Sequence, residues 1–407
     1  MRPGWNANPL SDVAQFINGL WKGEAPPFVH VGVIRNTNFT KDGQLDDTDI
    51  AYIDVETKKF QKRRLQPGDL ILEKSGGGPK QPVSRVVFFN KTDGEYSFSN
   101  FTAAIRVMDQ AVLDPRFLHL YLHWVYISGR TEAMQSHSTG IRNLNGDAYK
   151  AIEVVYPSLA DQRRIVAILD EAFEGIATAK AHAEKNLRNA REWSARQLSN
   201  ELEAAAASGR SDTLERMVAP SCSLSYGIVQ PGDEVSGGLP VVRPVDLGAK
   251  VVYAEGLKRI DPALARSYSR TTLEGNDLLL CVRGTTGTVA MADPALAGAN
   301  VTRGIVPIRF DPRAISQRLG YYLLRSEPVQ TQIRAKTYGT ALMQINISDL
   351  RRIVVALPPL QDQAALVERL DAIQEAADQL ADVYESKLVA LDELKQSLLH
   401  QAFSGQL

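Results

Sequence analysis

Residues 156–162 read YPSLADQ, and residues 357–363 read LPPLQDQ. The two stretches lie 201 positions apart, and at this offset 11 of the 32 positions from 139–170 and 340–371 are identical without a gap. The identical pairs include Asn145 with Asn346 and Gln162 with Gln363. A match at one fixed offset indicates an internal duplication, so the chain is predicted to contain two copies of one unit.

The match continues upstream of these stretches in a weaker form. GDLIL at 68–72 resembles NDLLL at 276–280, and the DPR at 114–116 recurs at 311–313. The offset drifts between these pairs, so the connecting loops differ in length. Each copy is therefore predicted to be a variable module, residues 1–156 and 211–356, followed by a better-matched tail, residues 157–210 and 357–407.

The tails have the pattern of long helices. Residues 160–207 contain no proline, and residues 361–403 contain neither proline nor glycine. Apolar residues recur there at spacings of three and four, which is typical of a coiled-coil seam. Pro157 and Pro358 suit helix starts, where a missing N–H costs nothing. The expected seams, which should bury against each other, include Ile165, Leu169 and Ile176 in the first tail and Leu366, Leu370, Ile373 and Leu380 in the second.

The modules read as mixed α/β. Short β-rich stretches alternate with turns rich in glycine and proline, and one helical stretch follows each DPR turn. The fold class is therefore α/β (mixed α+β), with two globular domains and two long helices. Expected strands lie at 29–34, 69–72, 83–89, 239–245, 277–282 and 287–290, and expected module helices at 117–124 and 315–324.

The composition of the chain argues against several other classes of protein. The chain has 407 residues, 44% of them apolar, and a net charge of −1, so its overall charge does not indicate a polyanion partner. Its two cysteines, Cys222 and Cys281, offer no disulfide framework and favour a reducing, cytoplasmic setting. The N-terminus has no apolar signal segment, and no apolar run is long enough for a membrane span.

A search for catalytic motifs finds none that is complete. The chain has no glycine-rich cofactor turn, no adenine pocket of the NPPY or DPPY type and no GxxxxGK[ST] motif. His119 and His123 have the i, i+4 spacing of zinc ligands, but no third ligand is evident and their neighbours look like packing residues. We therefore expect neither a catalytic nor a metal site in this chain.

Five segments carry a resemblance to a known family. They are YPSLADQRRIVAILD at 156–170, LPPLQDQAALVERLD at 357–371, LQPGDLILEKSGGG at 65–78, LEGNDLLLCVRGTTGTVAMA at 273–292 and YGTALMQINISDLRRIVVALP at 338–358. In this order and number they resemble the specificity (S) subunits of Type I restriction–modification systems, over essentially the whole chain. One departure is the first loop, KSGGGPK at 74–80, where the second copy has RGTTG at 283–287.

The resemblance implies two target-recognition domains, each reading one half of a split, asymmetric site in double-stranded DNA. The two tail helices would pack antiparallel and hold these domains apart. Such a subunit has no catalysis or cofactor of its own. It recruits two methyltransferase (M) subunits, which methylate adenine N6 with S-adenosylmethionine, and restriction (R) subunits, which use ATP and Mg.

Sequence reading requires side chains on loops that face a DNA groove. The candidates are Lys74, Ser75, Lys80, Arg142 and Asn143 in the first module and Arg283, Thr285, Thr286, Lys336, Tyr338 and Gln344 in the second. For each of them the alternative is a solvated loop residue. Apolar helix positions expected to bind M subunits are Leu187, Trp193, Leu198, Leu391 and Leu398.

Two other functions remain open from the residues alone. One is a self-contained modification or restriction enzyme, against which the missing cofactor motifs argue. The other is a coiled-coil adaptor that binds only proteins.

Overall fold

The chain divides into two units, and each combines one module with parts of both long helices. In the computed structural model, unit 1 comprises Met1–Glu184 and Ser386–Leu407, and unit 2 comprises Lys185–Glu385. The structure describes residues 4–20, 22–78, 81–138, 141–207, 209–340 and 342–407. The long helices are α5 (Leu159–Ala206) and α11 (Gln363–Ser404), as the tails predicted.

The module of unit 1 is built on a four-stranded antiparallel sheet in the order β2-β9-β5-β7 and a three-stranded sheet in the order β4-β3-β8. The seven strands are β2 (Ala14–Asn18), β9 (Thr102–Val107), β5 (Leu70–Glu73), β7 (Val86–Phe88), β4 (Ala51–Glu56), β3 (Phe28–Ile34) and β8 (Tyr96–Phe98).

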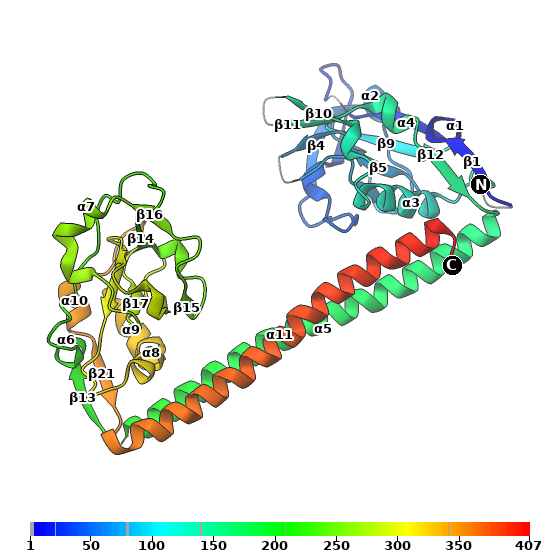
Figure 1. Cartoon of the computed structure of the whole chain (residues 1–407). Coiled ribbons are helices and arrows are strands. Elements are labelled where there is room, and N and C mark those ends of the chain that lie inside the picture. The colour runs from blue at the N-terminus through cyan, green and yellow to red at the C-terminus, as the bar shows by residue number, and fades with distance from the viewer. Residues whose placement is uncertain (1–3, 21, 79–80, 139–140, 208, 341) are drawn as a thin grey trace. The chain divides into compact units, whose positions relative to one another are not determined.

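Two smaller sheets and further α-helices complete the module of this unit (Figure 1). The sheets pair β1 (Asn6–Pro9) with β12 (Glu153–Tyr156), and β10 (Gln135–Ser138) with β11 (Ile141–Leu144) and β6 (Ser75–Gly77). The helices are α1 (Leu10–Val13), α2 (Thr57–Gln61), α3 (Pro115–Ile127) and α4 (Gly146–Lys150).

Unit 2 repeats this plan. Its sheets have the orders β15-β18-β17-β20, β16-β14-β19 and β13-β21. The strands are β15 (Val251–Val252), β18 (Val289–Ala292), β17 (Leu278–Cys281), β20 (Ile305–Ile308), β16 (Lys258–Ile260), β14 (Leu239–Val242), β19 (Asn300–Val301), β13 (Arg210–Thr213) and β21 (Val354–Leu357). The helices are α6 (Leu214–Met217), α7 (Pro262–Ala265), α8 (Gln317–Arg325), α9 (Glu327–Lys336) and α10 (Ile347–Arg351).

The central strand of each module is buried on both faces. In β5, Leu70 and Leu72 belong to the core around α3, whereas Ile71 belongs to the core on the other side of the sheet. In β17, Leu278 and Leu280 likewise face the core that contains α8, and Leu279 faces the opposite core. Since side chains alternate along a strand, the repeated apolar runs at 70–72 and 278–280 require a layer on each face.

The aspartate that precedes each central strand is a buried anchor. Asp69 accepts hydrogen bonds from the backbone N–H of Gln66 (2.7 Å) and from the Nε of Arg106 (2.7 Å). Asp277 accepts from the N–H of Glu274 (2.8 Å) and pairs with Arg309. A buried carboxylate needs such partners, because burying it without them would cost the folded state about 2 kcal/mol or more. The duplicated GD and ND therefore mark the same turn in both modules.

The glutamine that ends each repeated phrase ties a long helix to its module. Gln162 donates to the carbonyls of Pro157 and Val112 (both 2.9 Å), and Gln363 donates to those of Pro358 (3.2 Å) and Ala314 (3.0 Å). Both amides are almost completely buried. The phrases YPSLADQ and LPPLQDQ therefore recur because each closes a buried junction between a module and the helix that follows it.

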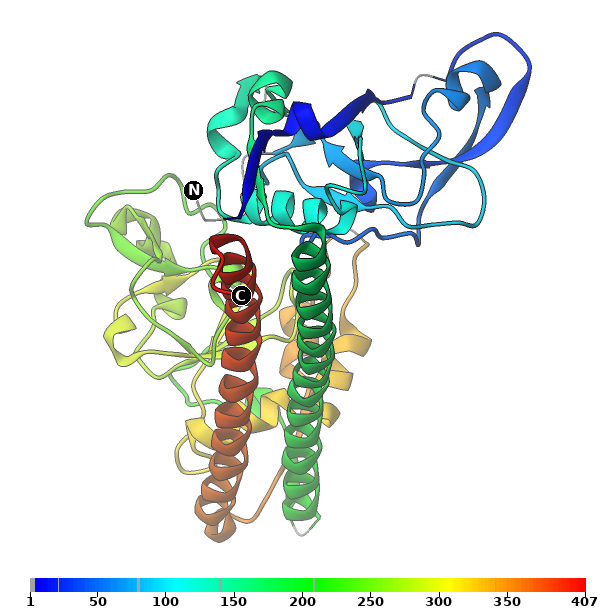
Figure 2. The ribbon, with the colours of Figure 1, turned by 90° about the vertical axis from the view of Figure 1, so that its right-hand side faces the viewer.

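Within each unit the α5 and α11 segments lie side by side and antiparallel (Figures 1 and 2). In unit 1, Lys180 pairs with Asp392 at 2.7 Å. In unit 2, Arg191 pairs with Glu385 and Glu201 with Arg369, both at 2.8 Å. These pairs are exposed and contribute little stability individually, but they fix the register of the two helices.

The buried seam differs from the predicted heptad pattern. Ile165, Ile176, Leu187 and Leu198 of α5 are at least half-buried and are spaced by 11 residues, as are Leu366, Ala377, Leu388 and Leu399 of α11. An 11-residue period corresponds to about 3.67 residues per turn, close to a straight α-helix. The prediction that Leu380 belongs to the seam is wrong, because its side chain is 41% exposed.

Each module helix packs against the end of a long helix. In unit 1, α3 lies across the ends of α5 and α11 (Figure 2), with the rings of Phe117 and Tyr121 both 5.3 Å from that of Phe403. The Arg116 guanidinium of α3 binds Asp170 of α5 at 2.7 Å. In unit 2, Tyr322 of α8 donates to Asp371 of α11 at 2.7 Å. Asp170 and Asp371 are one of the identical pairs of the repeat.

Candidate nucleic-acid interface

The candidate residues of unit 1 gather on the sheet formed by β10, β11 and β6. Ser75 of β6 pairs with Asn143 of β11, and its hydroxyl lies 2.5 Å from the Asn143 Oδ1. Arg142 donates to the amide oxygen of Gln135 on β10 (3.4 Å). The sequence placed these residues more than 60 positions apart, and the sheet brings them together. Lys80 lies outside the described residues.

Lys74 lies at the base of this sheet. Its ammonium group is 3.3 Å from the Asn18 side chain, and its backbone carbonyl accepts from the N–H of Leu144 on β11. Burial lowers the pKa of Lys74 below its usual value, because desolvation disfavours the charged form. The half-buried position leaves Lys74 less free to reach a phosphate than a surface lysine.

A buried hydrogen-bond network formed by Arg85, Glu73 and Asn36 contacts the strand β6 of this sheet. Arg85 donates to both carboxylate oxygens of Glu73 at 2.8 Å and to the carbonyl of Phe39 at 2.7 Å. The Asn36 amide lies 3.4 Å from Glu73 and 3.3 Å from the carbonyl of Ser75. The network therefore fixes the strand that carries Ser75. Glu73 and Arg85 were not predicted from the amino-acid sequence, because no sequence motif indicates that two charges 12 positions apart form a pair.

In unit 2 the same place is occupied by two loops rather than a regular sheet. Arg283 and Tyr338 each form an isolated β-bridge with Gln344, and Thr286 donates to the carbonyl of Met343 at 3.0 Å. The Thr285 hydroxyl contacts the buried Cys281 Sγ at 3.5 Å. These five predicted residues are thus brought together. Lys336 ends α9, two positions before Tyr338, and makes no described contact with the other candidates.

The two loops border an apolar hollow of about 510 Å³. Its lining includes Val229, Val245 and Leu342, with Arg283 and Arg303 beside them. Among the residues that the structure describes, neither arginine has an acidic partner, whereas Arg243 and Arg309 of the same module are paired with Asp246 and Asp277. Unpaired guanidinium groups beside apolar surface suit a ligand that has both phosphates and flat bases.

Arg303 and Val245 were not predicted from the sequence. Arg303 follows the Asn300-Val301-Thr302 segment, which echoes Asn100-Phe101-Thr102. This similarity indicates that Arg303 follows a segment of the repeat, but it does not predict that the Arg303 side chain is exposed. Val245 follows a proline in a turn, a setting that does not distinguish it from other loop residues.

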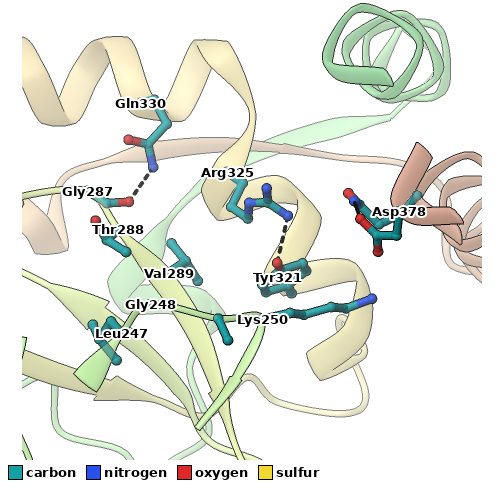
Figure 3. Close-up of a pocket in the computed structure, with 12 residues that line it drawn as sticks. Leu247, Gly248, Lys250, Gly287, Thr288, Val289, Tyr321, Arg325, Gln330 and Asp378 are labelled. Carbon is teal, nitrogen blue, oxygen red and sulfur yellow. Dashed lines mark hydrogen bonds between the residues drawn. The ribbon is translucent and has the colours of Figure 1, made fainter. Parts of the chain in front are cut away.

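A second hollow in unit 2, about 420 Å³, lies between the module and α11 (Figure 3). Arg325 donates to the Tyr321 hydroxyl at 2.6 Å, and Lys250 lies 5.7 Å from the Tyr321 ring. Asp378 of α11 faces them across the hollow (Figure 3). The described lining has one carboxylate and no histidine or cysteine.

The hollow in unit 1 beside α3, α5 and α11 measures about 710 Å³ and includes His123. Asp42 and Lys395 meet in it at 3.4 Å. Burial lowers the pKa of His123 to about 4, and the neighbouring Lys395 and Arg116 charges act in the same direction while Asp42 opposes them. The neighbouring His119 faces the carbonyls of Gly43 and Val86 (3.1 and 3.2 Å).

Both histidines are buried. No group of three side chains suited to a metal ion occurs in the described part of the chain. Likewise, no helix among the described residues is both long and apolar enough to cross a bilayer.

The depressed pKa of His123 predicts a pH-dependent stability. In the unfolded chain the imidazole takes up a proton near the ordinary histidine pKa of 6.5, but in the folded chain it does so only near 4. Between these values the unfolded state binds more protons. The contribution of His123 to stability is therefore complete above pH 6.5 and falls by about 1.4 kcal/mol per pH unit as the pH is lowered from 6.5 to 4, and the lowered pKa of the buried His119 acts in the same direction. Denaturant unfolding from pH 7 to 4.5 measures this slope, which His123→Gln should reduce. Parallel curves for the two proteins would contradict the assignment.

The partner-binding candidates on the helices differ in exposure. Leu187, Leu198, Leu391 and Leu398 are half-buried, and Leu198 and Leu398 pack against the cores of units 2 and 1. Trp193 is 50% exposed. The larger exposed apolar residues of the helices, which sequence spacing assigned to no role or to the seam, are Leu380, Val383, Val389 and Leu394.

Comparison with known proteins agrees with this architecture. The model of the family described as the Type I restriction modification DNA specificity domain matches residues 3–187 and 234–382. The chain is 24% identical to the Type I restriction enzyme StySPI specificity subunit of Salmonella potsdam, over 99% of this chain and 89% of that one. It is 27% identical to the EcoBI specificity subunit of Escherichia coli over 45% of this chain, a match that spans 39% of the relative's length.

Two solved structures share the fold. One, from a study of complex assembly and conformational transition of the type I R-M system, matches with a TM-score of 0.75 and 19% identity, covering 100% of this chain and 99% of that one. The HsdS subunit from Thermoanaerobacter tengcongensis matches with a TM-score of 0.57 and 17% identity, covering 100% and 98%. The family match extends over more than half of the chain and confirms the resemblance carried by the repeated motifs. The chain belongs to the family of Type I restriction–modification DNA specificity subunits.

Proposed function

We propose that this chain is the DNA-reading subunit of a Type I restriction–modification complex and that its two modules read two different short words of one target. The observation that carries this proposal is the repeated module with divergent loops. Both copies keep the Asp anchor and the Gln junction, whereas the candidate reading positions differ: Ser75 and Asn143 in one module correspond to Arg283 and Gln344 in the other.

Different side chains at base edges favour different bases, with each good contact worth about 1–3 kcal/mol of discrimination. The target should therefore be bipartite and asymmetric, two unlike words around an unread gap. The boundaries 1–156 and 211–356 are our proposal for the two reading modules, and 157–210 and 357–407 for the helices that link them. The chain itself performs no methylation or cleavage.

Binding to pools of random duplex DNA, in the presence of the cognate methyltransferase subunit, tests the DNA-reading role. We expect enrichment of one bipartite sequence, with affinity that falls as salt rises because phosphate contacts release counterions. Binding of the complex without sequence enrichment would favour a protein-binding adaptor instead. Methyl transfer by this chain alone would favour a self-contained enzyme.

We further propose that methyltransferase subunits dock on the exposed apolar positions of the helices, one in each unit. In unit 2, the Arg191–Glu385 pair places Trp193 of α5 and Val383 of α11 at the same level of the antiparallel pair. Their side chains are 50% and 60% exposed, large values for apolar residues in the middle of long helices. Val389 and Leu394 are exposed in the same way in unit 1. The duplication supplies two such surfaces, so two methyltransferase subunits are expected per chain.

Trp193→Ala with Val383→Ala should remove one methyltransferase subunit from the complex and leave the folding of the chain intact, since neither side chain is buried. Native mass measurement of the co-purified complex gives the stoichiometry directly. Leu264→Ala, at another exposed apolar position of unit 2, is the matched control. One methyltransferase at saturation in the wild-type complex, or two in the double variant, would contradict the docking proposal.

A further inference from the structure

An exposed apolar residue stands at the same repeat position in both modules. Ile141 opens β11 in unit 1, and Leu342 stands 201 positions later in unit 2. Each side chain is 47% exposed. The register between them is secure, because the identical Asn145 and Asn346 lie four residues further along and occupy the N-cap positions of α4 and α10.

Single exposed apolar residues are common on protein surfaces and need no special cause. Here the position is apolar and exposed twice, while its neighbours have diverged: Arg142 corresponds to Met343 and Asn143 to Gln344. In both modules the position adjoins the candidate reading residues. This arrangement associates the apolar side chain with the reading surface rather than with general surface composition.

In both modules the exposed apolar residue lies two positions before a residue with a side-chain amide. In unit 1, β10 and β11 pair antiparallel, and β6 extends them to a three-stranded sheet at the edge of the module (Figure 1). Ile141 and Asn143 are two positions apart on β11, so they lie on the same face of the sheet. In unit 2, Leu342 borders the apolar hollow beside Arg283 and Arg303, and Gln344 lies two positions away.

The major groove of B-DNA is wide enough to admit protein side chains from short β-structure. In unit 2, Arg283 and Arg303 provide the positive charge that phosphates require. On the base edges of that groove, the apolar group presented by the four ordinary bases is the C5-methyl of thymine. Asn and Gln amides are suited to adenine, the partner of thymine. An apolar tip next to an amide therefore matches words that contain A·T pairs.

From this chemistry we infer that Ile141 and Leu342 are specificity-determining residues, each of which packs against a thymine methyl group in the word read by its own module. The inference rests on the proposed DNA-reading function and deepens it. Loss of one buried methyl group should weaken binding about three- to fivefold.

Deoxyuridine scanning tests this inference. The target would first be identified by methylome sequencing of cells that carry the complex. Synthetic duplexes with that target would then have each thymine replaced by deoxyuridine, one at a time, and be titrated with the purified complex of this chain and its methyltransferase. One thymine of each word should show the three- to fivefold loss. Ile141→Ala should abolish that sensitivity in the first word, and Leu342→Ala in the second.

Matched controls are Val112→Ala and Val354→Ala, which truncate equally exposed valines at the module–helix junctions. They should leave the deoxyuridine sensitivity unchanged. The inference would be overturned if the wild-type complex bound its target specifically but showed no sensitivity to thymine replacement. It would also be overturned if that sensitivity survived in Ile141→Ala and Leu342→Ala. In both cases the DNA-reading function would stand. Loss of methyltransferase from either variant, with thymine sensitivity retained, would likewise overturn the inference in favour of a protein contact. Absence of any sequence-specific binding would instead reject the proposed function.

Discussion

Replacing Leu370 by aspartate is expected to unfold unit 2. Leu370 of α11 is completely buried in the core that also contains Leu366, Tyr322 and Leu319. A carboxylate there would have no counter-charge within that apolar cluster, and an unpaired buried charge is among the most costly changes a core can suffer. Leu370→Ala removes only packing and should lower the free energy of unfolding by about 2–5 kcal/mol.

Leu380→Ala is the matched control on the same helix. Its side chain is 41% exposed, so its truncation should change stability by at most about 0.5 kcal/mol. Thermal unfolding monitored by circular dichroism, with hydrogen exchange to locate the loss, compares the three variants. An unchanged melting temperature for Leu370→Asp would contradict the packing of α8 against α11.

Replacing Arg85 by methionine should destabilise unit 1 by about 3–5 kcal/mol, because it leaves the buried Glu73 carboxylate without its partner. The side chains of Arg85 and Glu73 are 8% and 1% exposed, and the guanidinium also binds the carbonyls of Phe39 and Asn36. Denaturant unfolding of the variant measures this loss.

The double variant Glu73→Met with Arg85→Met tests whether the loss of stability in Arg85→Met comes from the unpaired Glu73 carboxylate. Replacing both members of a buried pair by apolar residues is often nearly neutral, so the double variant should recover most of the lost stability. Because Asn36 connects Glu73 to the carbonyl of Ser75, the double variant should still alter the first word of the target and spare the second. A double variant as unstable as Arg85→Met would show that the ion pair is not the source of the loss.

The duplication, the long helices and the buried strands could be predicted from the sequence, because periodicity and repeated motifs report them directly. The 11-residue seam could not be distinguished from a heptad seam. Spacings of three and four fit both, and in the structure Ala381 is half-buried whereas Leu380 is exposed. A half-buried alanine adds little to the apolar periodicity from which a seam is predicted.

The residues of the candidate interface remain a prediction, and the structure shows which of them lie near one another. Ser75 and Asn143, or Arg283 and Gln344, could be named because each lies in a segment of the repeated motif, although Ser75 and Asn143 lie on strands rather than on the expected loops. Their pairing, and the contribution of Glu73, Arg85 and Arg303, depends on contacts between distant segments that no local pattern records. Ile141 and Leu342 were passed over because an apolar residue in a sequence is read as core, and only the structure shows that both are exposed.

The central claim is that each module reads its own word, and exchange of one module tests it most directly. Residues 211–356 would be replaced by the second module of another member of this family, and the methylomes of cells carrying the original and the exchanged subunit would be compared. The account predicts a bipartite, non-palindromic motif in which the exchange changes one word and leaves the other intact. A single continuous palindrome, or an exchange that alters both words, would contradict it.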